Sequence, residues 1–248
     1  LVGSEMCIRD STLCVDFFYV QGLVFLLSVS RNLKFHTVGH AKSRSKRTMV
    51  EGINRTRNMY VSRGFTITNI HADPEFNCIR NEMLPAVLNI TAAREHVGEV
   101  ERAIRTGKEV SRCITHTLPF KRIPILMVTS MVTASFSRLN DLPAPDGVSN
   151  EISPSTIVTG RPSPDYDVIT SVAFGTYVQT HDEPDPTNDM TTRTTSAIAL
   201  HPTGNEQGAY YFMSLATGER INRRSWTELP MDNVVIARVE AMALAQHQ

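Results

Sequence analysis

Residues Leu13–Ser30 read LCVDFFYVQGLVFLLSVS, and this stretch decides the fold of the chain. Aromatic and β-branched residues dominate both halves, which is typical of β-strands. The Gln21-Gly22 pair in the middle predicts a turn, so we expect a hairpin of two strands, Leu13–Val20 and Leu23–Ser30. A membrane-spanning helix needs about 20 consecutive apolar residues, and Asp16 together with the turn interrupts this run. We therefore expect no membrane segment.

The residues that follow alternate between strand-like and helix-like patterns. Runs with period-two alternation predict strands, and these are Asn32–Val38, Phe65–Ile70 and Val87–Ile90. Apolar residues at helical spacing predict helices, and these are Thr48–Ser62, Pro74–Met83 and Arg94–Arg112. Together with the hairpin they give the α/β order β-β-β-α-β-α-β-α, a meander followed by right-handed crossovers. This is the order of the ribonuclease H-like fold with its mixed sheet.

The rest of the chain predicts a different organisation. Leu118–Asn140 is apolar and compatible with helices, whereas Asp141–Asp167 is rich in Pro, Asp, Ser and Gly, as loops are. Four short β-like runs then predict a small all-β module, and these are Val172–Thr180, Thr194–Leu200, Ala209–Leu215 and Arg220–Trp226. We expect a core at residues 12–135, an acidic Pro-rich connector at 136–170, the β module at 171–231 and a tail at 232–248.

Residues 1–11, LVGSEMCIRDS, match neither the helical nor the strand period. They look like a translated sequencing adapter joined to the chain, and we exclude them from the predicted fold.

The charges of the chain cancel in total but are divided along it. There are 25 Lys and Arg against 25 Asp and Glu. From Arg31 to Arg122 there are 17 basic and 8 acidic residues, a balance of +9, whereas from Asp141 to Thr192 one Arg stands against nine acids, a balance of −8. This asymmetry indicates a segment that faces a polyanion; two solvated faces are the alternative. The basic run Lys42–Arg47 is a candidate DNA contact, a nuclear-localisation signal or a solvated loop.

Several carboxylates are placed where two-metal phosphoryl transfer needs them. That chemistry requires acids from different elements that converge around two Mg²⁺ ions about 4 Å apart. Asp16 lies within an apolar strand, where an ionised group is costly unless a cation or hydrogen bonds compensate it. Asp73 follows a strand, and sites collect at the carboxyl ends of strands in open α/β sheets. The helix Arg94–Arg112 offers a third acid from four candidates, Glu95, Glu99, Glu101 and Glu109.

Helical spacing favours Glu101 among these candidates. Glu101, Arg105, Lys108 and Arg112 share one face of the predicted helix, at i, i+4, i+7 and i+11. A metal-binding carboxylate at Glu101 is thus continued by cations able to meet a phosphate backbone. The alternative is an exposed helix with an ordinary Glu101–Arg105 ion pair.

A series of motifs occurs in fixed order along the chain. The first three are Val15-Asp16-Phe17-Phe18, the run 71–76 (HADPEF) and the run 95–102 (EHVGEVER). The later ones are Ser153-Pro154, 174–178 (FGTYV), 208–212 (GAYYF) and 217–221 (TGERI). From Leu13 to Met231 this series resembles the integrase core and the post-core region of copia-type LTR retrotransposon polyproteins. An ordered series is more specific than any one of its motifs.

The resemblance implies a polynucleotidyl transferase that trims cDNA ends and joins them to target DNA. It assigns Asp16, Asp73 and Glu101 to hold Mg²⁺ or Mn²⁺, while a metal-activated water or a DNA 3′-hydroxyl attacks directly. The predicted DNA-contacting residues are Arg102, Arg105, Lys108, Arg112, Lys42 and Lys46. The family further implies a homo-oligomer that assembles in the cytoplasm and acts in the nucleus.

The chain also departs from the family pattern. Retroviral-type integrases leave about 35 residues between the second and third acids, and Asp73 to Glu101 leaves 27. Glu109 fits the longer spacing but lies outside the matching motif, so it stays as the second choice. Gly107 within the same helix is expected to weaken it by about 1 kcal/mol relative to Ala. We expect a polyprotein fragment, and the alternative to an active enzyme is a relic that retains only nucleic-acid binding.

Overall fold

The computed structural model describes residues 10–91, 97–162, 165–181, 190, 192–205 and 207–248. The chain divides into two compact units by its internal contacts. The first comprises Leu1–Val110 with Ser135–Pro164, and the second comprises Ser111–Ala134 with Asp165–Gln248. No helix among the described residues is both long and apolar enough to cross a membrane.

The first unit is built on a five-stranded mixed sheet with the strand order β3-β2-β1-β4-β5. Its strands are β1 (Asp10–Val20), β2 (Leu23–Ser30), β3 (His36–Ala41), β4 (Thr66–Ala72) and β5 (Val87–Ile90). The first three form an antiparallel meander, and β4 and β5 run parallel to β1. The intervening helices are α2 (Lys46–Val61), the 3₁₀ helix η1 (Pro74–Met83) and α3 (Gly98–Thr117). This confirms the predicted mixed α/β order.

The hairpin predicted from Leu13–Ser30 is present, with Val20 paired to Leu23. Gln21 and Gly22 both adopt positive φ angles, 48° and 76°, which is the turn geometry that matches the twist of two-residue hairpins. Strand β1 begins earlier than predicted, at Asp10. Ser11, within the segment that we excluded, is buried, and its hydroxyl lies 2.6 Å from that of Ser30.

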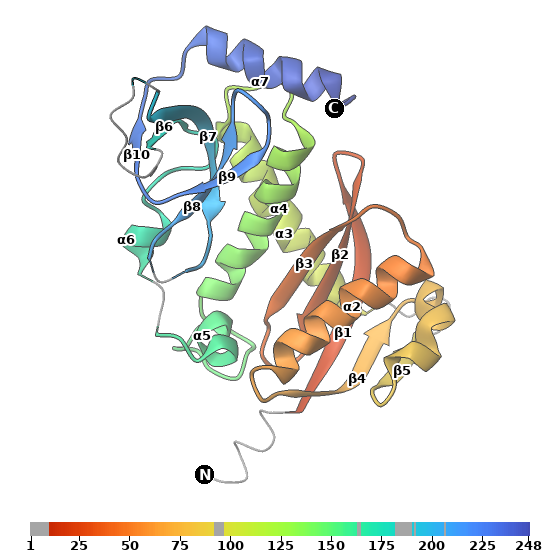
Figure 1. Cartoon of the computed structure of the whole chain (residues 1–248). Helices are drawn as coiled ribbons and strands as arrows, with labels where there is room; N and C mark the ends of the chain where they lie inside the picture. Colours follow the sequence, from red (N-terminus) through yellow and green to blue (C-terminus); the bar gives the residue numbers. More distant parts are fainter. Residues whose placement is uncertain (1–9, 92–96, 163–164, 182–189, 191, 206) are drawn as a thin grey trace. The chain divides into compact units, whose positions relative to one another are not determined.

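Alternation along β1 sends its side chains to two different layers. Leu13, Val15 and Phe17 belong to the larger core, together with buried residues of α2 and η1. Phe18 points to the opposite face and packs on Phe25 and Phe136 at ring-centroid distances of 5.4 and 5.7 Å. Figure 1 shows α2 on one side of the sheet and the first half of α3 on the other. Asp16, two residues before Phe18, therefore faces the α3 side.

The segment expected to be a connector, 136–170, contributes to the first unit. Helix α4 (Ile125–Asp141) extends into it, and α5 (Pro154–Thr159) begins at the cap Ser153. Val158 on α5 is 2% exposed and belongs to the larger core cluster. The prediction of a loop-dominated connector is therefore wrong at α5, because six residues are too few for a visible helical period within a polar stretch.

The second unit contains a five-stranded antiparallel sheet with the order β10-β6-β7-β8-β9. Its strands are β6 (Tyr177–His181), β7 (Thr194–Pro202), β8 (Tyr210–Ser214), β9 (Arg220–Arg223) and β10 (Trp226–Glu228). Tyr210, Phe212 and Trp226 form an aromatic cluster with ring centroids 5.1–6.2 Å apart. The predicted small β module is thus present, with the last run split into two strands. A short helix, α6 (Tyr166–Ile169), precedes this sheet.

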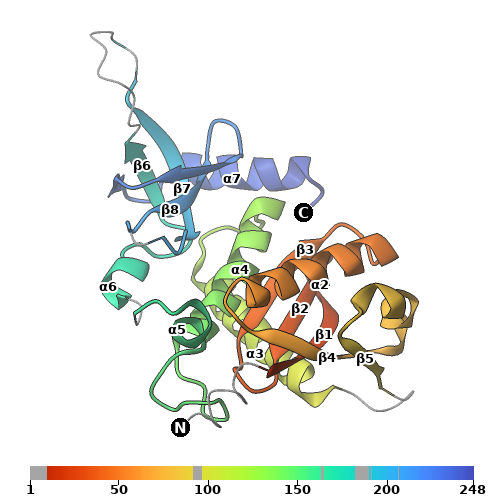
Figure 2. The same ribbon diagram turned by 60° about the horizontal axis from the view of Figure 1, so that its bottom comes forward.

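The last residues, expected to be a tail, form helix α7 (Asn233–Ala245), shown beside the second sheet in Figure 2. Val239 and Ala243 are fully buried. Arg238 donates hydrogen bonds of 2.9 Å to the carbonyl oxygens of Leu215 and Ala216. These contacts attach the helix to the β module.

Gly107 has a packing role that its low helix propensity conceals. A Cβ atom placed there would lie 2.2 Å from Cζ of Phe136 and 2.7 Å from both Cε atoms. Phe136 is 1% exposed and also packs edge-on against Phe18. The glycine therefore permits α3 to approach the ring of Phe136 on α4 closely.

We predict that Gly107→Ala destabilises the protein although alanine is the better helix former. Overpacking a filled core costs about 1–3 kcal/mol, which exceeds the gain in helix propensity of about 1 kcal/mol. Urea unfolding measures the difference. Gly98→Ala is the matched control, since nothing lies within 4 Å of a Cβ at Gly98. Shortening the neighbour, in Gly107→Ala with Phe136→Leu, should recover part of the loss, and a stable single Gly107→Ala variant would contradict this packing.

Candidate active site

Two carboxylates, Asp16 and Asp73, lie side by side on neighbouring parallel strands. In the β1–β4 pair Val15 is aligned with Ala72; Asp16 is the next residue of β1, and Asp73 directly follows the end of β4. Parallel neighbours lie about 4.8 Å apart, and aligned residues point to the same face. Asp73 keeps an extended backbone, with φ −68° and ψ 162°, as the chain leaves β4. Both carboxylates therefore belong to the face of the sheet that carries α3.

The surroundings of Asp16 are crowded with negative charge. Burial, followed by the charge of Asp73, raises the pKa of the Asp16 carboxyl to about 6. The Phe17 backbone N–H donates to Oδ1 of Asp16 over 2.6 Å and lowers this pKa, while Glu75 and Glu101 raise it. Acids from β1, from the start of η1 and from α3 thus act on one another at this point of the fold.

Helix α3 brings Glu101 into the surroundings of Asp16. The charge of Glu101 raises the pKa of the Asp16 carboxyl. Further along the helix, Nζ of Lys108 lies 5.9 Å from the ring centroid of Phe18 on β1. The first half of α3 therefore runs along the face of the sheet that carries Phe18 and Asp16.

The other two candidates for the third acid are placed differently. Glu99 forms an ion pair of 2.9 Å with Nε of Arg31, which engages its carboxylate at the start of α3. Glu95 lies outside the described residues. Among the candidates that the structure describes, Glu101 is the one whose charge raises the pKa of Asp16.

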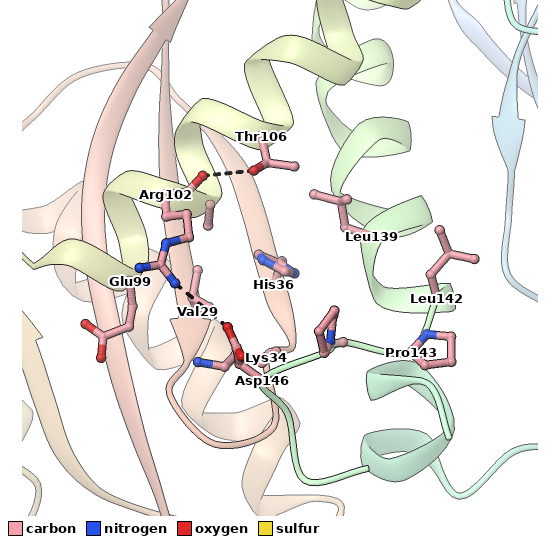
Figure 3. A pocket seen from close by; sticks show the side chains of 13 residues that line it. Val29, Lys34, His36, Glu99, Arg102, Thr106, Leu139, Leu142, Pro143 and Asp146 are labelled. Carbon is pink, nitrogen blue, oxygen red and sulfur yellow. Dashed lines mark hydrogen bonds and ion pairs between the residues drawn. The ribbon is translucent and has the colours of Figure 1, made fainter. Parts of the chain in front are cut away.

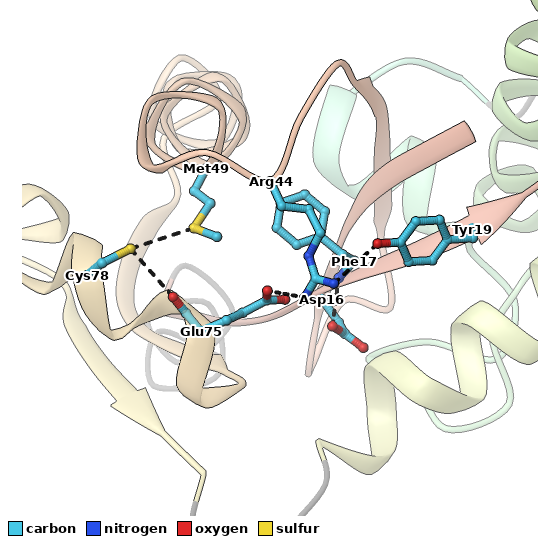
Figure 4. Close-up of polar contacts among 7 residues, drawn as sticks. All are labelled: Asp16, Phe17, Tyr19, Arg44, Met49, Glu75 and Cys78. Atoms are coloured by element: carbon cyan, nitrogen blue, oxygen red, sulfur yellow. Dashed lines mark hydrogen bonds and ion pairs between the residues drawn. The ribbon is translucent and has the colours of Figure 1, made fainter. Parts of the chain in front are cut away.

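A cation–carboxylate pair that sequence reasoning missed borders the acids (Figure 4). The Arg44 guanidinium is paired with Glu75, donates to the Tyr19 hydroxyl over 3.2 Å and lies 5.4 Å from the Phe17 ring centroid. Glu75 and its hydrogen bond to Arg44 raise the pKa of that guanidinium above its usual range. Two signals were present, the Asp-x-Glu phrase at 73–75 and Arg44 within the basic run, but no local pattern indicated that they meet.

The donor set suits magnesium only in part. Within the described ranges, no three or more His, Cys, Asp and Glu side chains gather closely enough to hold a metal ion. Mg²⁺ in phosphoryl-transfer sites is, however, commonly bound by one or two carboxylates together with waters and substrate phosphates. Asp16 and Asp73 meet that requirement, and a cation would relieve the repulsion that raises the pKa of Asp16. The two aspartates therefore fit Mg²⁺, with the exposed Glu101 beside them.

The basic run Lys42–Arg47 is largely engaged with acids of the same unit. Three of its side chains form ion pairs, Arg44 with Glu75, Lys46 with Glu82 and Arg47 with Glu51. The Lys46 pair measures 2.5 Å. Lys42 is exposed. Of the two predicted DNA contacts in this run, Lys46 thus has an acidic partner.

The cations of α3 are more open than those of the basic run. Arg102 lies 3.9 Å from Asp146, and both side chains are more than three-quarters exposed, so this pair contributes little. Three other cations of this helix form no ion pair with any residue that the structure describes: Arg105, Lys108 and Arg112. Helix α3 therefore combines the exposed Glu101 with a row of available positive charges.

The first unit is thus a mixed α/β fold with two carboxylates on adjacent parallel strands. No protein-family model and no curated protein matches the chain. Among solved structures, the catalytic core domain of BIV integrase is similar to it, with a TM-score of 0.44 and 16% identity over 60% of this chain and 93% of that chain.

We predict that replacing Asp16 by Asn stabilises the fold in a pH-dependent manner. Because the folded-state pKa of Asp16 is raised to about 6, the folded chain binds a proton that the unfolded chain releases near pH 4. The stability of the wild type should therefore fall relative to Asp16→Asn as the pH rises from about 4 to 7. After allowance for partial exposure we expect a change of about 1 kcal/mol. Urea unfolding of both proteins at pH 4.5 and 7.5 measures it, and an equal difference at both pH values would contradict the prediction.

Proposed function

We propose that the first unit is a ribonuclease H-like integrase core that transfers polynucleotide ends. The observation that carries the proposal is the alignment of Asp16 and Asp73 on adjacent parallel strands, with Glu101 acting on Asp16 from α3. Phosphoryl transfer depends chiefly on positioning and on stabilisation of negative charge, and convergent carboxylates that bind cations supply both. The ordered motifs shared with copia-type elements support DNA as the substrate.

In this proposal the two aspartates would hold Mg²⁺ or Mn²⁺, and Glu101 would complete the site. The bound cations would supply charge stabilisation at the phosphate and activation of the attacking oxygen. The oxygen of a water or of a DNA 3′-hydroxyl bonds to phosphorus while a P–O bond of the attacked strand breaks. Main-chain pairing of β1 with β4 fixes the backbone beside both aspartates up to Val15 and Ala72.

The charge on α3 supports the path of the DNA. Arg105, Lys108 and Arg112 continue the face that begins with Glu101, and their charges are available to phosphates. The run Lys42–Arg47 is a weaker candidate because three of its cations already have acidic partners. We propose that the backbone of the DNA follows α3, and that joining two DNA ends involves more than one copy of the chain.

A second candidate function is nucleic-acid binding without catalysis. The observation in its favour is that no three potential ligands are gathered closely within the described residues. The spacing of 27 residues between Asp73 and Glu101 is also shorter than the family pattern. Under this alternative the cations of α3 would still bind DNA, and the carboxylates would serve no reaction.

Strand-transfer assays separate the two candidates. We predict Mg²⁺-dependent joining of a labelled duplex end by the intact chain, and a loss of at least about 100-fold in Asp73→Asn, because interactions with the metal contribute several kcal/mol. Glu101→Gln should show a similar loss, whereas Glu109→Gln should retain activity. Equal activity of the wild type and Asp73→Asn, or no activity in either, would overturn the enzymatic proposal.

DNA affinity tests the role of α3 under both candidates. We predict that Arg105→Gln and Lys108→Gln each weaken duplex binding and reduce the dependence of log Kd on log salt by about 0.9 per lost phosphate contact. Lys121→Gln removes the same charge from an exposed residue outside this face and is the control. Fluorescence anisotropy between 50 and 200 mM salt measures both quantities. An unchanged salt slope in both α3 variants would exclude this face as the DNA contact.

A further inference from the structure

A pocket of about 320 Å³ lies in the first unit, away from the carboxylates (Figure 3). It is bounded by the start of α3, the end of α4 and the turn between β2 and β3. Its α3 residues are Glu99, Arg102, Ala103 and Thr106, which lie on a different face of the helix from Glu101 and its row of cations. The volume is at the lower end of the range of sites for small organic molecules.

One wall of the pocket is apolar and partly open to solvent. Leu139 near the end of α4, with Leu142 and Pro143 after the helix, forms this wall. Leu142 is 52% exposed. Apolar surface of this kind gains free energy when a ligand covers it, at about 25 cal/mol per Å². The two prolines of the loop, Pro143 and Pro145, restrict its backbone, so the wall is preformed.

The opposite side of the pocket presents positive charge. Lys34 and Arg102 both line it, and Figure 3 shows them near Asp146. The ion pair between Arg102 and Asp146 is long, at 3.9 Å, and both side chains are highly exposed. Lys34 forms no ion pair with the described part of the chain. The carboxylate of Glu99 is already paired with Arg31. The charge left for a ligand is therefore positive.

Lys34 is held in this position by an uncommon backbone conformation. Its φ is 54°, in the left-handed region that residues other than Gly seldom occupy. Its Cγ packs near Gly147, at 3.6 Å from where a Cβ of that residue would stand. Strained backbone that the surrounding structure maintains is concentrated at ligand sites. The strain is thus a second indication that Lys34 has a role in the pocket.

His36 adds a defined polar group to the lining. Oδ1 of Asn140 accepts from the His36 backbone N–H at 2.7 Å and lies 3.0 Å from Nδ1. Because this oxygen accepts, Nδ1 carries the ring proton and Nε2 is left as an acceptor. Burial lowers the pKa of His36, so the ring is neutral at pH 7. Nε2 has no hydrogen-bond partner in the described ranges, and a ligand hydroxyl fits it.

We infer that this pocket binds a small organic monoanion with an aromatic body, its carboxylate paired with Lys34 and Arg102 and its ring against Leu139, Leu142 and Pro143. A neutral apolar molecule would leave Lys34 unpaired and Arg102 with only its exposed pair to Asp146, and an inorganic anion would leave the apolar wall uncovered. A phenolic hydroxyl on the far side of the ring would donate to His36. The inference stands on residues separate from the proposed catalytic carboxylates and does not depend on their function.

Titration of the ¹⁵N-labelled full chain with 4-hydroxyphenylacetate tests the site. We expect saturable shifts of the amide signals of Ala103 and Thr106, which line the pocket. The matched amide, 4-hydroxyphenylacetamide, lacks the charge and should bind at least about tenfold more weakly, as should acetate, which lacks the ring. Phenylacetate, which lacks only the hydroxyl, should bind a few-fold more weakly.

Variants of the lining then identify the groups responsible. Lys34→Asn removes the charge while tolerating the positive φ, and we expect Kd for 4-hydroxyphenylacetate to rise about tenfold. Lys34→Arg should retain binding, and Lys121→Asn, outside the pocket, should leave Kd unchanged. The inference is overturned if the carboxylate and the amide bind equally, if Lys34→Asn binds like the wild type, or if millimolar probe shifts neither amide signal.

Discussion

The parallel pairing of β1 with β4 is the constraint on which the candidate site depends. The register that aligns Val15 with Ala72 places Asp16 and Asp73 next to each other on one face. A slip of one residue would turn the second carboxylate to the opposite face, because side chains alternate along a strand. The same register also puts Val15 and Ala72 into the larger core, where both are fully buried. Burial of Val15 and Ala72 in the core therefore fixes the register of the two strands, and this register determines where the two acids lie on the opposite face.

Placing the carboxylates there lowers the stability of the folded protein. Asp16 stands between the buried residues Val15 and Phe17, and three further acids act on it. A half-buried carboxylate among like charges favours its protonated form, which is why its pKa rises to about 6. The surrounding core, with the stacked rings of Phe17 and Phe76 at 5.3 Å, holds this arrangement in place. Such local destabilisation is typical of sites that bind a charged ligand.

The sequence was sufficient wherever the signal was local. Alternation and turn residues predicted the hairpin and the strands that pair in parallel, with Asp16 inside the first strand and Asp73 directly after a later one. Contacts between distant residues were not predictable in this way. The approach of Gly107 to Phe136, the pairing of Arg44 with Glu75 and the burial of Val158 on α5 each join segments that no local period relates. Gly107 has a low helix propensity, but the ring of Phe136 leaves no room for a Cβ atom at this position.

The division of charge along the chain becomes informative once the ion pairs are known. The segment with a balance of +9 contains acids that neutralise Arg31, Arg44, Lys46 and Arg47. The positive charge that stays available is consequently concentrated on α3 rather than in the basic run, although the run has the denser sequence of cations. Because Glu101 on the same helix acts on Asp16, these exposed cations belong to the helix that borders the carboxylates. Ion pairing, more than the number of basic residues, therefore determines which positive charges of this segment are available to a partner.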